Sequence, residues 1–335
     1  MQWNKGFSAQ YFITQVDPKT WGDMGSLRAT SGSISRDGDS TLINSADLSL
    51  DRDPGEIWVR VYLYANQNGS SAREALFTGL TSTPNNSVEG WRVSHDVTCY
   101  SVLKPCSDVL LDIGWYTPKG MFAIDLVADL LSVSPAPIKI VNKFDSPVLA
   151  DYIVAESGES NLSMAVKILS AIGWTMGIDG SGVITIHPVQ NVIKATFDGL
   201  NNDIIEPSFS NSNDWYSCPN VFRAVSDNEC KVIRDMDINS KLSIPSRGRE
   251  IWAEETSVTL VGGESLEQYA WRRLKELQSP SHPVTYSRRF VPNVYPGDLV
   301  RILYPGNKLN GIFMVKSQSI ELSHAATTEE TVSEA

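Results

Sequence analysis

Apolar and polar residues alternate in short runs through the first hundred residues of the chain. Turn sequences such as Asp37-Gly38 and Asn68-Gly69 separate these runs, which are rich in β-branched or aromatic residues. The runs cover residues 7–14, 32–36, 46–50, 57–64, 75–79 and 91–100. This pattern predicts an antiparallel barrel or sandwich, closed or nearly closed.

The run from 57 to 64 differs from the others because apolar or aromatic side chains occupy both of its faces, apart from Arg60. Such a strand lies in the centre of a sheet or against another subunit. Trp58 and Tyr62 are therefore candidates for an interface. Trp91, which opens the run 91–100, is a further candidate because tryptophan and tyrosine are enriched at interfaces.

The periodicity becomes helical in the middle of the chain. Residues 122–131 carry apolar side chains at helical steps, and residues 161–172 form a second such segment that ends at Gly173, a residue suited to a left-handed cap. Two short runs, 174–178 and 183–187, follow around Asp179-Gly180-Ser181-Gly182 and predict a tight hairpin. Together these elements predict a small α/β module.

Strands return after residue 197, most clearly at 218–225 and 251–260, and the helix 264–278 follows them. Ser265 and Gln268 fit a capping box at its start. Its apolar stripe consists of Leu266, Tyr269, Ala270, Leu274 and Leu277. Leu266 and Leu274 are thus predicted to be packed.

The helix precedes three predicted strands, 284–291, 299–304 and 312–322, the last of which we expect to be the final strand of the chain. Pro296, Gly297 and Asp298 form a turn between the first two. We expect the helix to lie on this small antiparallel sheet.

The predicted fold class is mainly β with an α/β insert, an α+β arrangement. Three domains are expected from the change in texture along the chain: an N-terminal β-barrel-like domain at 1–104, a small α/β module at 105–190, and a second β domain at 191–335 that contains the helix 264–278. The order suggests that the middle module is inserted into a β framework or swung out from it.

Composition adds limits to this picture. Hydrophobic residues make up 41% of the 335 residues and nine are tryptophan, which indicates a globular chain with aromatic residues buried or in interfaces. A net charge of −11 argues against general or sequence-specific nucleic-acid binding, since that binding depends on lysine and arginine. No stretch approaches the roughly 20 apolar residues that span a bilayer, and the N-terminus has no signal-peptide pattern, so we expect cytoplasmic assembly and no membrane insertion.

No catalytic motif is evident in the sequence. His95 and Asp96 are adjacent near Cys99, but neighbouring strand residues point to opposite faces, so they do not form a dyad. The acidic residues Asp47, Asp51, Asp53 and Glu56 lack the glycine and the glutamate spacing of a calcium loop. We therefore expect neither an enzyme nor a cofactor.

The cysteines do not indicate a metal site either. Cys99, Cys106, Cys218 and Cys230 match no common zinc spacing and are expected to be reduced and mostly buried. The arginine pairs 247/249 and 272/273 could hold anions, although salt bridges between subunits or solvated faces account for them better in an acidic chain.

The C-terminal pattern resembles a known family. The helix ending in Ala-Trp-Arg-Arg-Leu-Lys-Glu-Leu-Gln, the stretch Pro292-Asn-Val-Tyr-Pro-Gly-Asp-Leu-Val-Arg-Ile302 and the stretch Gly311-Ile-Phe-Met-Val-Lys316 occur in that order. Upstream, the helix and hairpin of 162–187 and the Cys-Pro-Asn-Val-Phe of 214–225 fit the same picture. In this order they resemble the hub proteins of phage tails of the late-control-D type, over about two thirds of the chain.

The resemblance implies a structural virion protein that forms a homotrimer, in which two barrel-like domains per chain build a pseudo-sixfold ring. Such a ring would join the tail tube or distal tail protein to a spike or tail fibre, contain the end of the tape-measure protein, and line the DNA exit channel. It would reside in the tail tip or baseplate of the virion. Acidic charge suits a channel through which DNA slides without sticking.

Two alternatives stay open on the residues alone. One is a carbohydrate- or receptor-binding tail module that uses Trp58, Trp91 or Trp115 as sugar platforms. The other is a cell-wall hydrolase of the tail tip, although no lysozyme or peptidase segment is evident.

Overall fold

The protein was analysed as a computed structural model. It describes the following residues: 1–89, 92–118, 120–143, 146–149, 152–189, 192–201, 203–211, 216–226, 229–256, 258, 260, 264–278, 283–304 and 309–334. Strands make up 47% of the residues and helices 15%. The predicted fold class, mainly β with an α/β insert, is confirmed.

The N-terminal strands form one half of a large sheet, with the order β2-β1-β5-β6-β8-β4-β3. Their bounds are β1 Ser8–Val16, β2 Asp23–Leu27, β3 Ala29–Asp37, β4 Asn44–Leu50, β5 Trp58–Gln67, β6 Ser70–Thr81, β7 Asn85–Glu89 and β8 Arg92–Ser101. All six strands predicted in this region are present. β5 is central, as its two apolar faces indicated, because β1 and β6 pair with its two edges.

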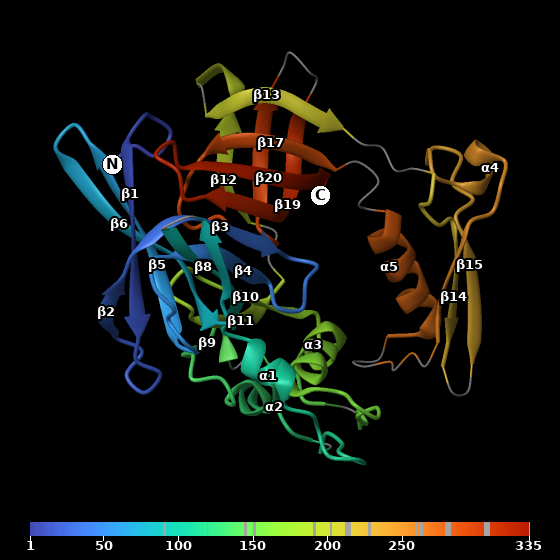
Figure 1. Cartoon of the computed structure of the whole chain (residues 1–335). Helices are drawn as coiled ribbons and strands as arrows, with labels where there is room; N and C mark the ends of the chain where they lie inside the picture. Colours follow the sequence, from blue (N-terminus) through green and yellow to red (C-terminus); the bar gives the residue numbers. More distant parts are fainter. Residues whose placement is uncertain are drawn as a thin grey trace.

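The C-terminal strands continue the same sheet (Figure 1), because β19 pairs antiparallel with β3. The order then runs β3-β19-β20-β17-β13, while β18 pairs with β19 and β12 pairs in parallel with β18. Their bounds are β12 Ile193–Asp198, β13 Ile204–Asn211, β17 Val284–Arg289, β18 Leu299–Tyr304, β19 Leu309–Glu321 and β20 Thr327–Glu334. A short 3-10 helix, η2 (Gly199–Asn201), follows β12.

The prediction that the strand at 312–322 is the last of the chain was wrong, because β20 follows it. The buried residues of β20 include Thr328 and Glu330 as well as Val332. Because two of these inward positions are polar, the strand does not show the alternation of apolar and polar residues by which strands are recognised in a sequence. This strand pairs with both β17 and β19 and closes the C-terminal half of the sheet.

The middle module interrupts the sheet between β8 and β12, as an inserted module should. It contains α1 Lys104–Asp108, α2 Ala123–Leu131, α3 Asn161–Ala171, and the small sheet β10-β11-β9, with bounds Trp174–Ile178, Ile184–Pro188 and Ile138–Ile140. Both predicted helices and the hairpin are confirmed, and Gly173 has the left-handed φ of 69° expected of a helix cap. Its core also takes in Val16 and Trp58 of the N-terminal sheet.

The helix that the sequence assigned to residues 264–278 is α5, Leu266–Gln278. Its capping box is confirmed, because Ser265 N donates to Gln268 Oε1 at 2.9 Å and Gln268 N donates to Ser265 Oγ at 3.2 Å. Leu266 and Leu274 are buried on its packed stripe, as predicted.

The expected partner of α5 was wrong. The helix packs on β14 (Val221–Val225) and β15 (Cys230–Arg234), not on the C-terminal strands. Phe222, Ala224 and Ile233 share its core, and β16 (Trp252–Glu255) and α4 (Ile244–Arg247) complete this α5 module. An apolar stripe shows that a helix packs but not on which of two nearby sheets, and here the upstream hairpin supplies the complementary face. The boundaries of the three predicted domains stay predictions.

Candidate functional site

Over six adjacent strands, one face of the large sheet carries mainly short hydroxyl and carboxylate side chains, together with Tyr100 of β8. Opposed residues of an antiparallel pair point to the same side, so the register of the strands defines this face. We call it the polar face. Its members are Thr285 and Ser287 of β17, Glu329 and Thr331 of β20, Ser317, Ser319 and Glu321 of β19, Ser33, Ser35 and Asp37 of β3, Ser45, Asp47 and Ser49 of β4, and Asp96 and Thr98 of β8.

Hydrogen bonds between strands hold these side chains close to the sheet. Thr98 Oγ1 donates to Asp47 Oδ1 at 2.8 Å, and Ser49 Oγ donates to Asp96 Oδ1 at 2.5 Å. At the other end, the hydroxyls of Thr285 and Thr331 lie 3.0 Å apart. The result is a flat, wet and negatively charged surface.

Basic side chains of the same strands stand at the margins of the polar face. Arg289 is at the end of β17, and Lys316 is at the bulge of β19, where its Nζ lies 3.9 Å from Asp39 Oδ1. A polyanion near the middle of the face therefore meets carboxylates and hydroxyls.

The opposite side of the sheet carries a buried ionic group at the seam between the two halves of the chain. Arg288 Nε lies 2.6 Å from Glu330 Oε2, and Gln318 Nε2 donates to Glu330 Oε1 at 2.9 Å. Gln318 Oε1 in turn accepts from Arg36 Nη1 at 3.1 Å. This seam cluster connects β17, β20 and β19 to β3, so it fixes the N-terminal half of the sheet against the C-terminal half.

The tip of the middle hairpin, residues 179–182, docks on the outer side of β5 and β6. Thr78 Oγ1 donates to Gly180 O at 2.9 Å, and Arg60 Nη2 and Trp21 Nε1 donate to Ser181 O at 3.1 and 2.9 Å. A side chain at Gly180 would collide with the backbone of Ala75. The tip must therefore be glycine to come this close to the sheet.

The predicted interface candidates of β5 have different surroundings. Trp58 is only 8% exposed and packs against Trp21, with ring centroids 5.6 Å apart. Tyr62 lies near the surface, where its hydroxyl donates to Asp23 Oδ2 at 2.8 Å and the Arg73 guanidinium stacks 3.6 Å from its ring centroid. Trp91 lies outside the described residues. Their part in an interface stays a prediction.

The sugar-platform alternative needs an exposed tryptophan. Trp58 is covered by the chain itself, and Trp115 packs partly buried against the core of the middle module. Trp252 and Trp271 are the more exposed tryptophans, at 48% and 38%, so the sugar-platform alternative stays a prediction.

The predicted Pro296-Gly297-Asp298 turn is present and has a structural task. Gly297 adopts a φ of 91° and its N–H donates to Val315 O at 2.8 Å, while Asp298 Oδ2 accepts from Tyr295 N at 2.9 Å. Burial raises the pKa of Asp298 against this hydrogen bond. The turn ties the start of β18 to β19 beside the seam cluster.

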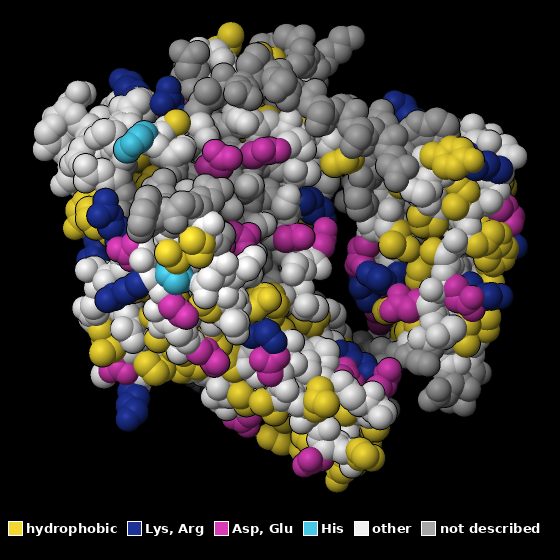
Figure 2. Space-filling view, viewed as in Figure 1, with side chains coloured by type: hydrophobic (Ala, Val, Ile, Leu, Met, Phe, Trp, Pro, Cys, Tyr) yellow, Lys and Arg dark blue, Asp and Glu magenta, His cyan; other side chains and the backbone are white. Residues whose placement is uncertain are grey.

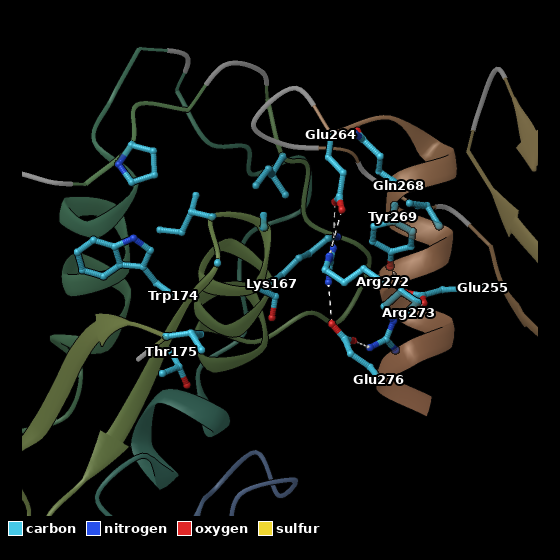
Figure 3. A pocket seen from close by; sticks show the side chains of 18 of the residues that line it. Lys167, Trp174, Thr175, Glu255, Glu264, Gln268, Tyr269, Arg272, Arg273 and Glu276 are labelled. Carbon is cyan, nitrogen blue, oxygen red and sulfur yellow. Dashed lines mark hydrogen bonds and ion pairs between the residues drawn. The ribbon is translucent and has the colours of Figure 1, made fainter. Parts of the chain in front are cut away.

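A cleft of about 1,340 Å³ separates α5 from the end of α3 and the start of β10 (Figure 3). On the α5 wall, Arg272 lies 3.0 Å from both Glu264 and Glu276, and Arg273 lies 3.1 Å from Glu255. Hydrogen bonding to Glu264 raises the pKa of Arg272.

The two arginine pairs that were considered as anion sites, 247/249 and 272/273, have partners within the chain. The pair 272/273 forms salt bridges within the chain to Glu255, Glu264 and Glu276, which balance its charge. Arg247 and Arg249 donate to the carbonyl of Tyr216 at 2.9 and 2.8 Å. Neither pair is arranged as an anion site.

Other chemistry was sought among the described residues. In that part of the chain, no three His, Cys, Asp or Glu side chains gather in a way that could hold a metal ion. His95 contacts Asn86 at 2.6 Å while Asp96 faces Ser49, which confirms that they point to opposite sides of β8. Among the described helices, none has the length and apolar character needed to cross a membrane.

Solved structures with related architecture include three phage tail proteins. The 43 kDa tail protein of prophage MuSo2 from Shewanella oneidensis superposes with a TM-score of 0.71 at 12% identity, covering 98% of each chain. A tail protein from Neisseria meningitidis MC58 gives 0.71 at 14% identity over 98% of this chain and 96% of that one. Prophage tail protein gp18 from Listeria monocytogenes EGD-e gives 0.54 at 12% identity, over 97% and 94%.

The chain has the fold of phage tail proteins. The resemblance noted in the sequence is confirmed at this level. Neither the protein-family models nor the curated proteins that were searched match the sequence.

Within this tail-protein fold, the sequence analysis missed the polar face. Its signal was present as Ser-x-Ser-x-Asp at 33–37, Ser-x-Asp-x-Ser at 45–49 and Ser-x-Ser-x-Glu at 317–321. Each alternates with core residues such as Ile34, Leu48 and Ile320, so the outward positions could have been read as one continuous face.

Proposed function

We propose that the chain is a structural, non-enzymatic hub protein of a phage tail tip or baseplate, and that its polar face lines the channel through which DNA leaves. The observation that carries this proposal is the chemistry of that face. Five carboxylates and ten hydroxyls cover six strands, with basic groups at the margins. The carboxylates of this surface repel DNA phosphates. The small hydroxyls keep the surface hydrated and do not bind the bases tightly.

The wider hub assignment extends the tail-protein fold. Three solved tail proteins share the architecture over nearly the whole chain, which supports a role in the virion tail. Each chain contributes two halves of a sheet, joined through the β3–β19 pair. Three copies around a threefold axis would therefore place six similar β units in one ring, which is a pseudo-sixfold arrangement. Such a homotrimer would contact the tube or distal tail protein on one side and a spike or fibre on the other, with the tape-measure protein ending in its lumen.

The proposal is tested by reversing charge on the polar face in assembled particles. Asp47, Asp96 and Glu329 are replaced together by Lys, and a second variant carries Asn, Asn and Gln at these positions. We expect normal numbers of tails but slowed DNA ejection in the lysine variant, with a smaller effect in the neutral one, since only added cations hold phosphate.

The matched control is Glu56→Lys, an exposed acid between β4 and β5 that lies off the polar face. It should leave ejection unchanged. Equal ejection in all three variants would contradict the channel-lining role. Loss of tails without a change in ejection from the remaining particles would indicate an assembly defect only.

A further inference from the structure

Two segments of the middle module run antiparallel beside each other. Thr117 N donates to Ile153 O and Ala155 N donates to Trp115 O, both at 2.9 Å, and Leu149 N donates to Met121 O at 3.0 Å. Isolated bridges pair Tyr116 with Val154 and Phe122 with Val148. The two segments thus form an irregular ladder whose side chains alternate between two faces.

The outward side of this ladder is apolar, although its inward side already packs on the module core. Thr117, Leu149 and Ile153 are buried inside. The outward side chains, which we call the apolar ladder, are Tyr116, Phe122, Val148, Tyr152 and Val154, and each is between 49% and 57% exposed. Hydrophobic side chains gather along the lower edge of Figure 2, where the segments around α1 and α2 project.

A complementary surface lies at the other side of the molecule, on β1, β2 and β5. It is a groove of about 710 Å³ where Phe12 and Tyr64 are 49% and 37% exposed, with ring centroids 5.2 Å apart. Arg28, Arg52 and Arg73 line it together with one acid, Asp51. We call it the arginine groove. Arg28 and Arg52 form no ion pair with any residue of the described part of the chain.

The two surfaces are opposite in charge. The segments that carry the apolar ladder, 108–122 and 146–160, contain five carboxylates and a single lysine, and Lys104 and Lys167 outside them pair with three of these carboxylates, which leaves the region net negative. The arginine groove holds three arginines and one acid within a chain of net charge −11, and Arg73 pairs with Asp23, so Arg28 and Arg52 carry its excess positive charge. Both surfaces present exposed aromatic side chains, which are enriched at protein interfaces.

We propose that copies of this chain join head to tail, with the apolar ladder of one copy docked into the arginine groove of the next. This inference rests on the ring under the proposed function and names the surfaces that build it. Unlike surfaces on opposite sides of one chain give a heterologous contact, which closes into a ring when the rotation between copies allows.

The exposed area fits this role. Five half-exposed side chains offer on the order of 400 Å² of apolar surface, about the largest patch that a monomer leaves uncovered. This area is about half of the roughly 800 Å² per partner that a standard interface buries, so residues beside the ladder would supply the rest.

The test measures the mass of the full chain in solution by light scattering. The ladder variant carries Tyr152→Asp and Val154→Asp, and the groove variant carries Arg28→Glu and Arg52→Glu. We expect the unaltered chain to form closed oligomers and each variant to be a monomer. An equal mixture of the two variants should give dimers and nothing larger, because each retains the one half of the contact that the other lacks.

Ile238→Asp, at a side chain that is 79% exposed and away from both surfaces, is the control and should keep the oligomer. Oligomers that persist in both variants would overturn the inference. They would not affect the channel-lining role, which the ejection experiment tests separately. An unaltered chain that is monomeric in solution would also overturn the inference. So would variants that stay oligomeric but fail to enter tails, because that result would assign these surfaces to contacts with another tail protein.

Discussion

Arg288 and Glu330 form a bidentate ion pair with almost no exposure to solvent. Nε lies 2.6 Å from Oε2 and Nη2 lies 3.0 Å from Oε1. Tyr286 also donates to Oε2, at 2.8 Å, so both carboxylate oxygens are satisfied. The pair joins β17 to β20 within the C-terminal half of the sheet, and Gln318 links it to Arg36 of β3 in the N-terminal half.

Glu330→Gln should destabilise the protein by about 3–5 kcal/mol, because it leaves the buried Arg288 charge without its partner. Replacing both residues, as Arg288→Met with Glu330→Leu, should restore most of the loss. Urea unfolding measures both effects. Glu254→Gln, which breaks an exposed pair with Arg223, is the control and should leave stability unchanged.

Acid should weaken the same contact. Burial acts to raise the pKa of Glu330, but the Arg288 charge and the hydrogen bonds from Arg288, Gln318 and Tyr286 outweigh it and lower the pKa below that of an ordinary glutamate. A lowered pKa contributes stability that is fully present above the unfolded value of about 4.3 and is lost as pH falls through the folded value. The stability difference between the unaltered chain and Glu330→Gln should therefore be constant near neutrality and shrink below about pH 4. A constant difference down to pH 2 would contradict this.

Leu274→Asp should unfold the α5 module and leave the large sheet folded. Leu274 is fully buried in a core formed with β14 and β15 and separate from those of the sheet. Even Leu274→Ala should cost about 2–5 kcal/mol within the module. Hydrogen exchange should show lost protection in α5 and β14 but not in β4 or β5. Lys275→Ala, on the exposed side of the helix, should change neither region.

Gly180→Ala should displace the middle hairpin from the N-terminal sheet, since the added Cβ would collide with the backbone of Ala75. Overpacking of this kind costs about 1–3 kcal/mol. Gly177→Ala is the matched control in the same hairpin, because a Cβ there meets nothing within 4 Å. Thermal unfolding of the two variants gives the comparison, and equal melting temperatures would show that the tip is not tightly docked.

The cysteines should differ in reactivity. Burial raises the pKa of Cys99 to about 12, and Cys106 and Cys218 are also buried, whereas Cys230 is exposed. Iodoacetamide reacts with the thiolate. At pH 8 the native chain should be alkylated at Cys230 alone and the unfolded chain at all four cysteines, as read by mass spectrometry of the peptides. Rapid labelling of Cys99 in the native chain would contradict its placement in the core.

Regular alternation and capping signals in the sequence predicted most of the strands and helices. Ser265 and Gln268 cap α5 as expected, and Gly173 ends α3. Partners in space were harder to predict: the stripe of α5 was compatible with two sheets, and β20 was hidden because the carboxylate of Glu330 replaces an apolar side chain in its core. A buried charge is understandable only with its partner Arg288, which lies 42 residues away in the chain.

The polar face shows the same limit in another form. In the sequence, Asp47 was weighed as part of a calcium loop and Asp96 as a partner of His95, in two separate runs. Only the register of β3, β4 and β8 against β19 and β20 brings them onto one surface with Glu329. Sequence alternation gives the side of a strand, and the sheet order decides which strands share it.

Electron cryo-microscopy of the tail tip, or of rings formed by the purified chain, tests the central claim most directly. The account predicts a threefold ring with a central hole whose wall carries Asp47, Asp96 and Glu329. A ring with these residues on its outer surface, or a particle in which the chain surrounds no channel, would contradict it.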